Sequence, residues 1–176
     1  RHGCCLSFPG LKALSDEVAE ILGQTEGRLL LAGLTELSDL AAESLSQHEG
    51  RLDLSGLLSL SEVAARYFVA AGKRSDRSVL VLGFHELPEE LVTALTPPPQ
   101  PDNPLDNITD IFGYYYTLSF PMINNLTSEV AREFARHGCC LSFPGLKALS
   151  DEVAEILGQH KGRLLLAGLT ELSDLA

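Results

Sequence analysis

Two short segments of this 176-residue chain carry the side chains best suited to metal binding or to nucleophilic chemistry. Each reads His-Gly-Cys-Cys, once at residues 2–5 and again at residues 137–140. A zinc site normally takes four ligands, with two to four residues between paired cysteines. These cysteines are adjacent instead, and no second pair of ligands accompanies them. We therefore expect free thiols and no metal or cofactor, with a site shared between neighbouring segments as the alternative. Free thiols favour a reducing compartment such as the cytoplasm.

The histidines have a structural explanation that needs no metal. Four of the five recur at one place, near the end of a predicted helix: His2, His48, His137 and His160. The helix dipole favours an imidazole at that end, where the ring can also bond carbonyls that lack a partner. We therefore predict that these side chains stabilise the fold, and that His85, which stands elsewhere in the pattern, lies at the surface.

Composition and missing motifs restrict the classes of function. The chain has 24 acidic and 13 basic side chains, a formal net charge of −11, so its own field repels nucleic acids and anionic membranes. No apolar run approaches the ~18 residues that a membrane span needs. The sequence contains no P-loop, dinucleotide fingerprint, G-x-S-x-G or H-E-x-x-H motif. We therefore expect a protein that is not an enzyme, binds no nucleic acid and inserts into no membrane.

The segments that must position these residues recur at two periods. Residues 1–41 reappear as residues 136–176 with 39 of 41 positions identical, which either a recent duplication or an artefact of sequence assembly explains. A shorter period has the consensus L-x-x-L-S-[DE]-x-A-x-x-x-[LF]-x-x-H-x-G-x-L-x-L-x-G. Five such units, of 23, 23, 27, 39 and 23 residues, make up the long period. We expect the two copies of the 41-residue segment to superpose.

Each unit predicts one helix and one strand. Leu14, Val18 and Leu22 follow helical spacing, and Ser15 stands where an N-cap belongs. The L-x-L pairs that follow point two apolar side chains to one side of a strand. These pairs are Leu29/Leu31, Leu52/Leu54, Val79/Val81, Leu118/Phe120, Leu141/Phe143 and Leu164/Leu166. Because neither element buries its apolar side alone, the units must stack. The sequence therefore predicts an α/β fold with a parallel ladder of about seven strands and a layer of helices behind it.

The pattern L-x-L-x-G-L-x-x-L-S resembles a leucine-rich repeat, and most closely a bacterial form with 23 residues per repeat. The resemblance covers almost the whole chain apart from an insertion at residues 96–116. It departs from the usual repeat by lacking the asparagine ladder, near whose place Gly33 and Gly56 stand. The family implies a solenoid that serves as a binding scaffold. We interpret residues 1–176 as a single repeat array and as a fragment of a longer one.

If the L-x-L side chains point inward, the residues between them form an open face. Stacking the units predicts two outward columns on it, and in leucine-rich repeats the equivalent face commonly binds protein. The first column contains Arg28, Arg51, Ser78, Thr117, Cys140 and Arg163. The second column contains Leu30, Asp53, Leu80, Ser119, Ser142 and Leu165. We predict that these residues contact a protein partner.

The insertion is a second candidate surface. Its prolines favour a stiff, extended segment, and it ends in an aromatic run that includes Tyr114, Tyr115 and Tyr116. Tyrosines are enriched in the residues that dominate interfaces, so these three are further candidates for partner binding. The alternative is a loop that packs on its own array.

The sequence therefore predicts a non-catalytic scaffold that binds another protein through the outward strand residues. The alternative is a structural spacer or surface stalk in a longer repeat protein, which the two near-identical copies favour. The outward residues differ from unit to unit, which suits a binding surface better than a spacer. Because both ends of the chain fall inside a repeat, we also expect end-to-end association.

Overall fold

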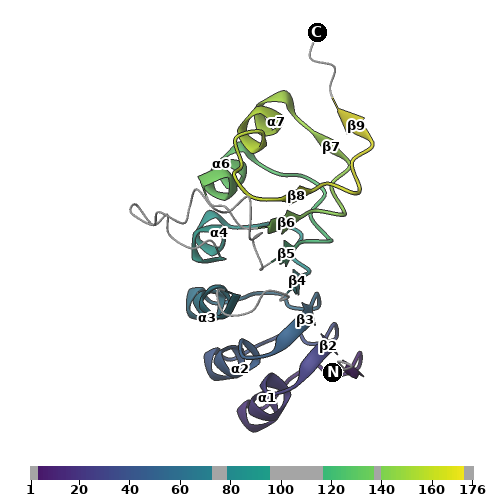
Figure 1. The fold of residues 1–176 in the computed structure, drawn as a ribbon, viewed down its shortest axis with the longest axis vertical. Coiled ribbons are helices and arrows are strands. Elements are labelled where there is room, and N and C mark those ends of the chain that lie inside the picture. The colour runs from purple at the N-terminus through teal and green to yellow at the C-terminus, as the bar shows by residue number, and fades with distance from the viewer. Residues whose placement is uncertain (1–3, 73–78, 96–116, 137–139, 173–176) are drawn as a thin grey trace.

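Seven parallel strands form the sheet around which this protein is built (Figure 1). The structure, a computed structural model, describes residues 4–72, 79–95, 117–136 and 140–172. Neighbouring strands of the sheet follow one another in chain order. They are β1 (Cys4–Ser7), β2 (Glu26–Leu30), β3 (Glu49–Leu54), β4 (Val79–Leu82), β5 (Thr117–Ser119), β6 (Cys140–Ser142) and β8 (Leu164–Leu165). The predicted α/β class and the parallel sheet are confirmed.

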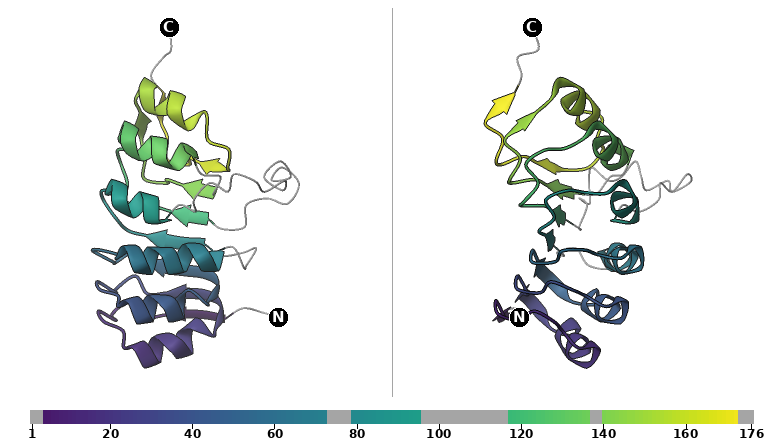
Figure 2. Two further views of the ribbon diagram at one scale, coloured as in Figure 1. Left: turned by 90° about the vertical axis from the view of Figure 1, so that its left-hand side faces the viewer. Right: turned by 180° about the vertical axis from the view of Figure 1, so that it is seen from behind.

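The helices of the described residues form one layer on one face of this sheet (Figure 2). Each packs chiefly against the helix before it and the helix after it. They are α1 (Asp16–Gly23), α2 (Asp39–Leu45), α3 (Glu62–Gly72), α4 (Glu89–Leu95), α6 (Ser128–Arg136) and α7 (Asp151–Leu157). The described helices therefore cover one face of the sheet and leave the other to its strand side chains.

Serine caps begin α1, α2, α3 and α7, as predicted. The hydroxyls of Ser15, Ser38, Ser61 and Ser150 each accept a hydrogen bond from the backbone N–H three residues later, at 3.4, 3.0, 3.0 and 3.3 Å. Each hydroxyl satisfies an N–H group that has no partner within its helix. The helices therefore start at the residues that the sequence pattern indicates.

The same caps also connect neighbouring units, which the sequence pattern did not reveal. The hydroxyl of Ser38 donates to Asp16, and that of Ser61 donates to Asp39, each at 2.5 Å. The acceptor is the first residue of the preceding helix, where the positive end of the helix dipole favours a carboxylate. One serine therefore caps its own helix and fixes the distance to the helix before it.

The core lies between the sheet and the helices, and its side chains recur from unit to unit. Leucines at equivalent strand positions, such as Leu29, Leu118 and Leu141, are fully buried. Aromatic contacts join the later units: the ring of Phe120 lies 5.8 Å from that of Phe134 and 5.6 Å from that of Phe143, between centroids. The L-x-L side chains therefore face the helices, as predicted, in every strand but β4.

Strand β4 corrects the predicted register. The prediction places Val79 and Val81 inward and Leu80 outward. In the structure, Leu80 pairs with Leu52 on one side and with Leu118 on the other, so that it shares their inward direction. Leu80 is 2% exposed and belongs to the hydrophobic core. The prediction that Leu80 contacts a partner is therefore wrong.

A shorter turn after β4 is the physical reason for this difference. A Cβ added to Gly83 would lie 1.7 Å from the backbone oxygen of Ser55, just as one added to Gly56 would lie 2.2 Å from that of Ala32. The two glycines thus fill the same place, where the preceding unit approaches too closely for a side chain. Gly56 comes two residues after its last inward leucine, whereas Gly83 follows Leu82 directly. The prediction assumed that the last inward residue always stands two residues before the glycine. In β4 it stands one residue before Gly83, so the predicted register is shifted by one residue.

A second, two-stranded sheet was not predicted. In it, β7 (Ala148–Leu149) pairs in parallel with β9 (Glu171–Leu172). The equivalent residues of the first 41-residue copy, 13–14 and 36–37, form no strand. The order of the main strands and helices is the same in the two copies, with helices that begin at Asp16 and Asp151.

Gly23 and Gly158 are the same residue of the two copies in different surroundings. A Cβ at Gly23 would lie 2.0 Å from the backbone oxygen of Ser44, whereas one at Gly158 meets only its own helix, at 3.3 Å. We expect Gly23→Ala to lower the free energy of unfolding by about 1–3 kcal/mol, because α2 must move away. Gly158→Ala should raise it by about 0.4–1 kcal/mol, because alanine restricts the unfolded chain. Urea titrations measure both, and equal changes would contradict the close approach of α1 and α2.

Candidate binding surface

The face of the sheet opposite the helices presents two columns of side chains, and we term it the open sheet face. Alternate residues of a strand point to opposite sides, so the neighbours of the buried leucines face away from the helices. The strand register gives the first column as Cys5, Arg28, Arg51, Val79, Thr117 and Cys140. It gives the second column as Ser7, Leu30, Asp53, Val81, Ser119, Ser142 and Leu165.

Most of the predicted contact residues stand in these columns. They are Arg28, Leu30, Arg51, Asp53, Thr117, Ser119, Cys140, Ser142 and Leu165, with Arg163 directly before β8. Val79 and Val81 take the places predicted for Ser78 and Leu80. Cys5 and Ser7 are additional, and extending the columns to the first unit would have found them. Ser78, Tyr114, Tyr115 and Tyr116 lie outside the described residues.

The open sheet face is most accessible at its two ends. Cys5, Ser7 and Arg28 are exposed near the first strand, and Arg163 is exposed near the last. In the middle the columns are closed, because Val81 is 3% and the free thiol of Cys140 is 4% exposed. A partner on this face would therefore reach β1 to β3 and β8 most easily.

The strands β2 and β3 bring charged residues of this face together. Arg28 and Arg51 pair in register, and Arg51 Nη2 lies 3.8 Å from Asp53 Oδ2. The backbone N–H of Ser55 donates to Asp53 Oδ1 at 3.1 Å, which holds this carboxylate in place. Arg51 Nε is buried without a hydrogen-bond partner. The guanidinium of Arg51 is therefore only weakly fixed by its surroundings.

Two of the four histidines predicted to be structural, His48 and His160, connect units, whereas His2 and His137 lie outside the described residues. The ring of His48 is 6% exposed, with Nδ1 3.2 Å from Thr25 Oγ1 and Nε2 3.2 Å from the carbonyl oxygen of Gly27. His160 Nδ1 lies 3.0 Å from the carbonyl oxygen of Phe134, in the last turns of α6. The partners thus belong to the preceding unit. Within the described residues, no three His, Cys, Asp or Glu side chains gather in a way that could hold a metal ion.

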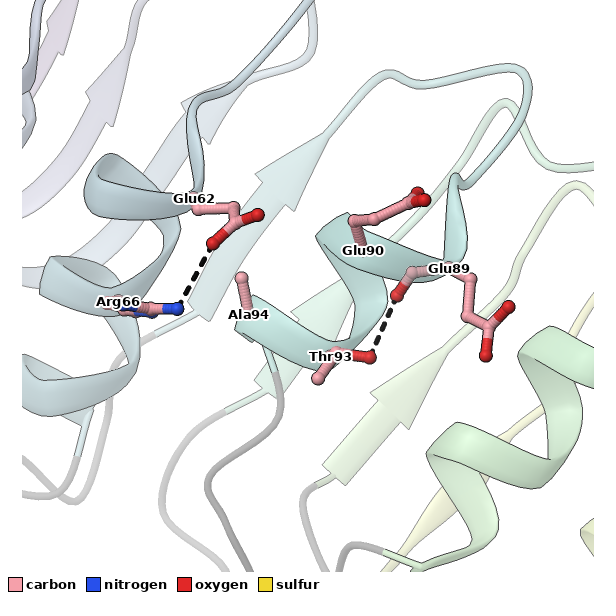
Figure 3. A pocket seen from close by; sticks show the side chains of 6 residues that line it. All are labelled: Glu62, Arg66, Glu89, Glu90, Thr93 and Ala94. Carbon is pink, nitrogen blue, oxygen red and sulfur yellow. Dashed lines mark hydrogen bonds and ion pairs between the residues drawn. The ribbon is translucent and has the colours of Figure 1, made fainter.

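The helix layer contains a shallow groove of about 430 Å³ between α3 and α4 (Figure 3). It is lined by Glu62, Arg66, Glu89, Glu90, Thr93 and Ala94. The guanidinium of Arg66 pairs with Glu62 at 3.1 Å, and Thr93 Oγ1 donates to the carbonyl oxygen of Glu89 at 2.9 Å. The groove is therefore acidic, and the one arginine in its lining is held by a carboxylate of its own helix.

Negative charge extends over the helix layer beyond this groove. Acidic side chains occupy the first turns of the helices, including Asp16, Asp39, Glu62 and Asp151. Glu43 raises the pKa of Tyr67 above its usual value, first through its charge, while burial of the phenol and a hydrogen bond to Glu43 act in the same direction. The helix layer would therefore attract cations.

No protein-family model matches this chain, and comparison with curated proteins and with solved structures gave no match. Within the described residues, no helix combines the length and the apolar character that crossing a membrane requires.

Proposed function

We propose that this chain is a leucine-rich-repeat-like solenoid that binds a protein partner through its open sheet face, without chemistry on that partner. The observation that carries this proposal is the contrast between the two faces of the strands. The inward positions repeat leucine or phenylalanine, whereas equivalent outward positions hold Leu30, Asp53, Val81 and Ser119 in turn. A spacer would have no need for such variety.

The size and chemistry of the open sheet face support the same proposal. Seven strands at ~4.8 Å spacing form a ladder roughly 29 Å long, which suits an extended contact with a protein. The accessible part combines the guanidinium groups of Arg28 and Arg51 with the half-buried side chain of Leu30. Arginine is enriched among the residues that dominate protein interfaces, and a neighbouring apolar side chain adds contact area.

A triple variant of the open sheet face tests the proposal. Leu30→Glu, Val79→Glu and Leu165→Glu add three negative charges at half-buried outward positions. We expect the wild-type chain to capture a specific partner by cross-linked pull-down from a lysate of the cells that produce it. The triple variant should lose that partner, because each glutamate places a charge within the contact.

The matched control adds the same charge to the helix layer. Ile21→Glu, Ala70→Glu and Gln159→Glu alter exposed positions and should capture the same partner as the wild type. Circular dichroism establishes that both variants fold. Capture of the partner by the open-face variant would contradict the proposed surface. If all three folded proteins captured nothing specific, the chain would be a structural spacer instead.

A further inference from the structure

Three exposed apolar side chains lie at, or shortly before, the beginnings of the neighbouring helices α2 and α3, and we term them the apolar patch. Leu58 is 79% exposed, Leu40 62% and Val63 46%. Leu40 directly follows Asp39, and Val63 follows Ser61 by two residues. The 2.5 Å hydrogen bond from Ser61 to Asp39 holds these two helix starts together. Leu58 precedes Ser61 by three residues. Its backbone N–H donates to the carbonyl oxygen of Thr35 in the preceding unit at 3.2 Å.

The apolar patch departs from the pattern of the other units. The place of Leu40 and Val63 is taken elsewhere by exposed glutamates, which are Glu17, Glu90, Glu129 and Glu152. The place of Leu58 is polar in the other units, with Lys12, Thr35, His85, Asn124, Lys147 and Thr170. The fold therefore does not require apolar side chains here. A single exposed leucine is ordinary, but a group of them at adjacent positions is typical of an interaction surface.

Carboxylates border the apolar patch. Glu36, Asp39 and Glu62 belong to the same two units and are exposed. Arg66, a cation of α3, is paired with Glu62 at 3.1 Å. The surroundings of the patch are thus negative, in a chain whose formal net charge is −11. A complementary partner presents apolar side chains flanked by lysine or arginine.

The shape of the patch indicates how such a partner is folded. The patch spans the starts of two packed helices, whose axes in such packing lie about 8–10 Å apart. One helix laid across them covers this width. A helix with an apolar stripe and basic flanks supplies both kinds of side chain.

We propose that the apolar patch docks an amphipathic, basic helix of a partner protein. The apolar side of that helix contacts Leu40, Leu58 and Val63, and its basic residues reach the bordering carboxylates. This surface lies on the helix layer, so the proposal does not depend on the function of the open sheet face.

A binding titration on the full chain tests the proposal. The probe is a short fluorescein-labelled peptide of leucine and lysine, with the leucines at helical spacing. We expect its fluorescence anisotropy to rise on binding, and Leu40→Ser with Leu58→Ser and Val63→Ser to weaken binding about tenfold or more. Ile21→Ser with Met122→Ser removes exposed apolar side chains elsewhere, 66% and 45% exposed in the wild type, and should leave the affinity unchanged.

A second pair of measurements isolates the charge. Glu36→Gln with Glu62→Gln should weaken binding and reduce its dependence on salt, because two bordering carboxylates are lost. A peptide with glutamate in place of lysine should not bind. Equal affinity of the wild type and the serine variant of the patch, with both folded by circular dichroism, would overturn the proposal. So would self-association of the wild type that the serine variant abolishes, because the occupant would then be a second copy of the chain.

Discussion

Leu80→Glu should destabilise this protein more than Val79→Glu by a wide margin. Leu80 is 2% exposed between Leu52 and Leu118, so glutamate would lose its packing and bury a charge without a partner. We expect the free energy of unfolding to fall by about 4 kcal/mol or more, a large share of the ~5–15 kcal/mol that holds a typical domain together. Urea denaturation followed by circular dichroism measures the change.

The neighbouring position supplies the control for this prediction. Val79 is half-buried on the open sheet face, in register with Arg51. We expect Val79→Glu to change the free energy of unfolding by no more than about 1 kcal/mol, because the new carboxylate stays near water and a guanidinium. A larger loss of stability in Val79→Glu than in Leu80→Glu would contradict the observed register. It would indicate that Val79 and Val81 face the helices and that Leu80 faces outward.

Phe143→Ala and Phe8→Ala should differ strongly, although the two phenylalanines occupy the same position of the duplicated segment. Phe143 is fully buried, with its ring 5.6 Å from that of Phe120 and 5.7 Å from that of Phe134. Its removal should lower the free energy of unfolding by about 3–5 kcal/mol through lost contacts and a cavity. Phe8 is 39% exposed beside the first strand, and its removal should cost only about 1 kcal/mol.

Differential scanning calorimetry of the two variants and the wild type compares these effects directly. The duplication is its own control here, because Phe8 and Phe143 lie within segments that are identical at 39 of 41 positions. A similar loss of stability in both would mean that the ring of Phe8 is covered as completely as that of Phe143.

The sequence predicts the helices and strands well where the residues that begin or form them lie within a single unit. Helix starts are predictable at Ser15, Ser38 and Ser150, because the hydroxyl of each can accept a hydrogen bond from the backbone N–H three residues later. Alternating leucines predict strands, because every second side chain of a strand points to the same face of the sheet. These signals are local, so a single unit suffices to read them.

The failures come from features that a single unit does not contain. Residues 79–82 read Val-Leu-Val-Leu, so apolar character alone does not show whether the valines or the leucines point inward. The shorter turn after Leu82 places the leucines inward. The pairing of β7 with β9 and the hydrogen bond from Ser38 to Asp16 join residues about one unit apart. Spacing within one unit carries no trace of either contact.

The two candidate surfaces also differ in how far the sequence predicts them. The columns of the open sheet face follow from strand alternation, so the outward position of most of their members is predictable from the sequence. The apolar patch was not predicted, because a consensus emphasises positions that repeat, whereas Leu40, Leu58 and Val63 stand where the other units are polar.

The order of the strands determines how this protein would respond to tension. β1 and β8 lie at opposite ends of the sheet, so a pull on these two strands acts along the hydrogen bonds between neighbouring strands. Such a load breaks one pair of strands at a time instead of shearing all of them together. Each 23-residue unit that opens would add roughly 80 Å of extended chain. Stretched between its first and last strands, the molecule would therefore lengthen in low-force steps, one strand pair at a time.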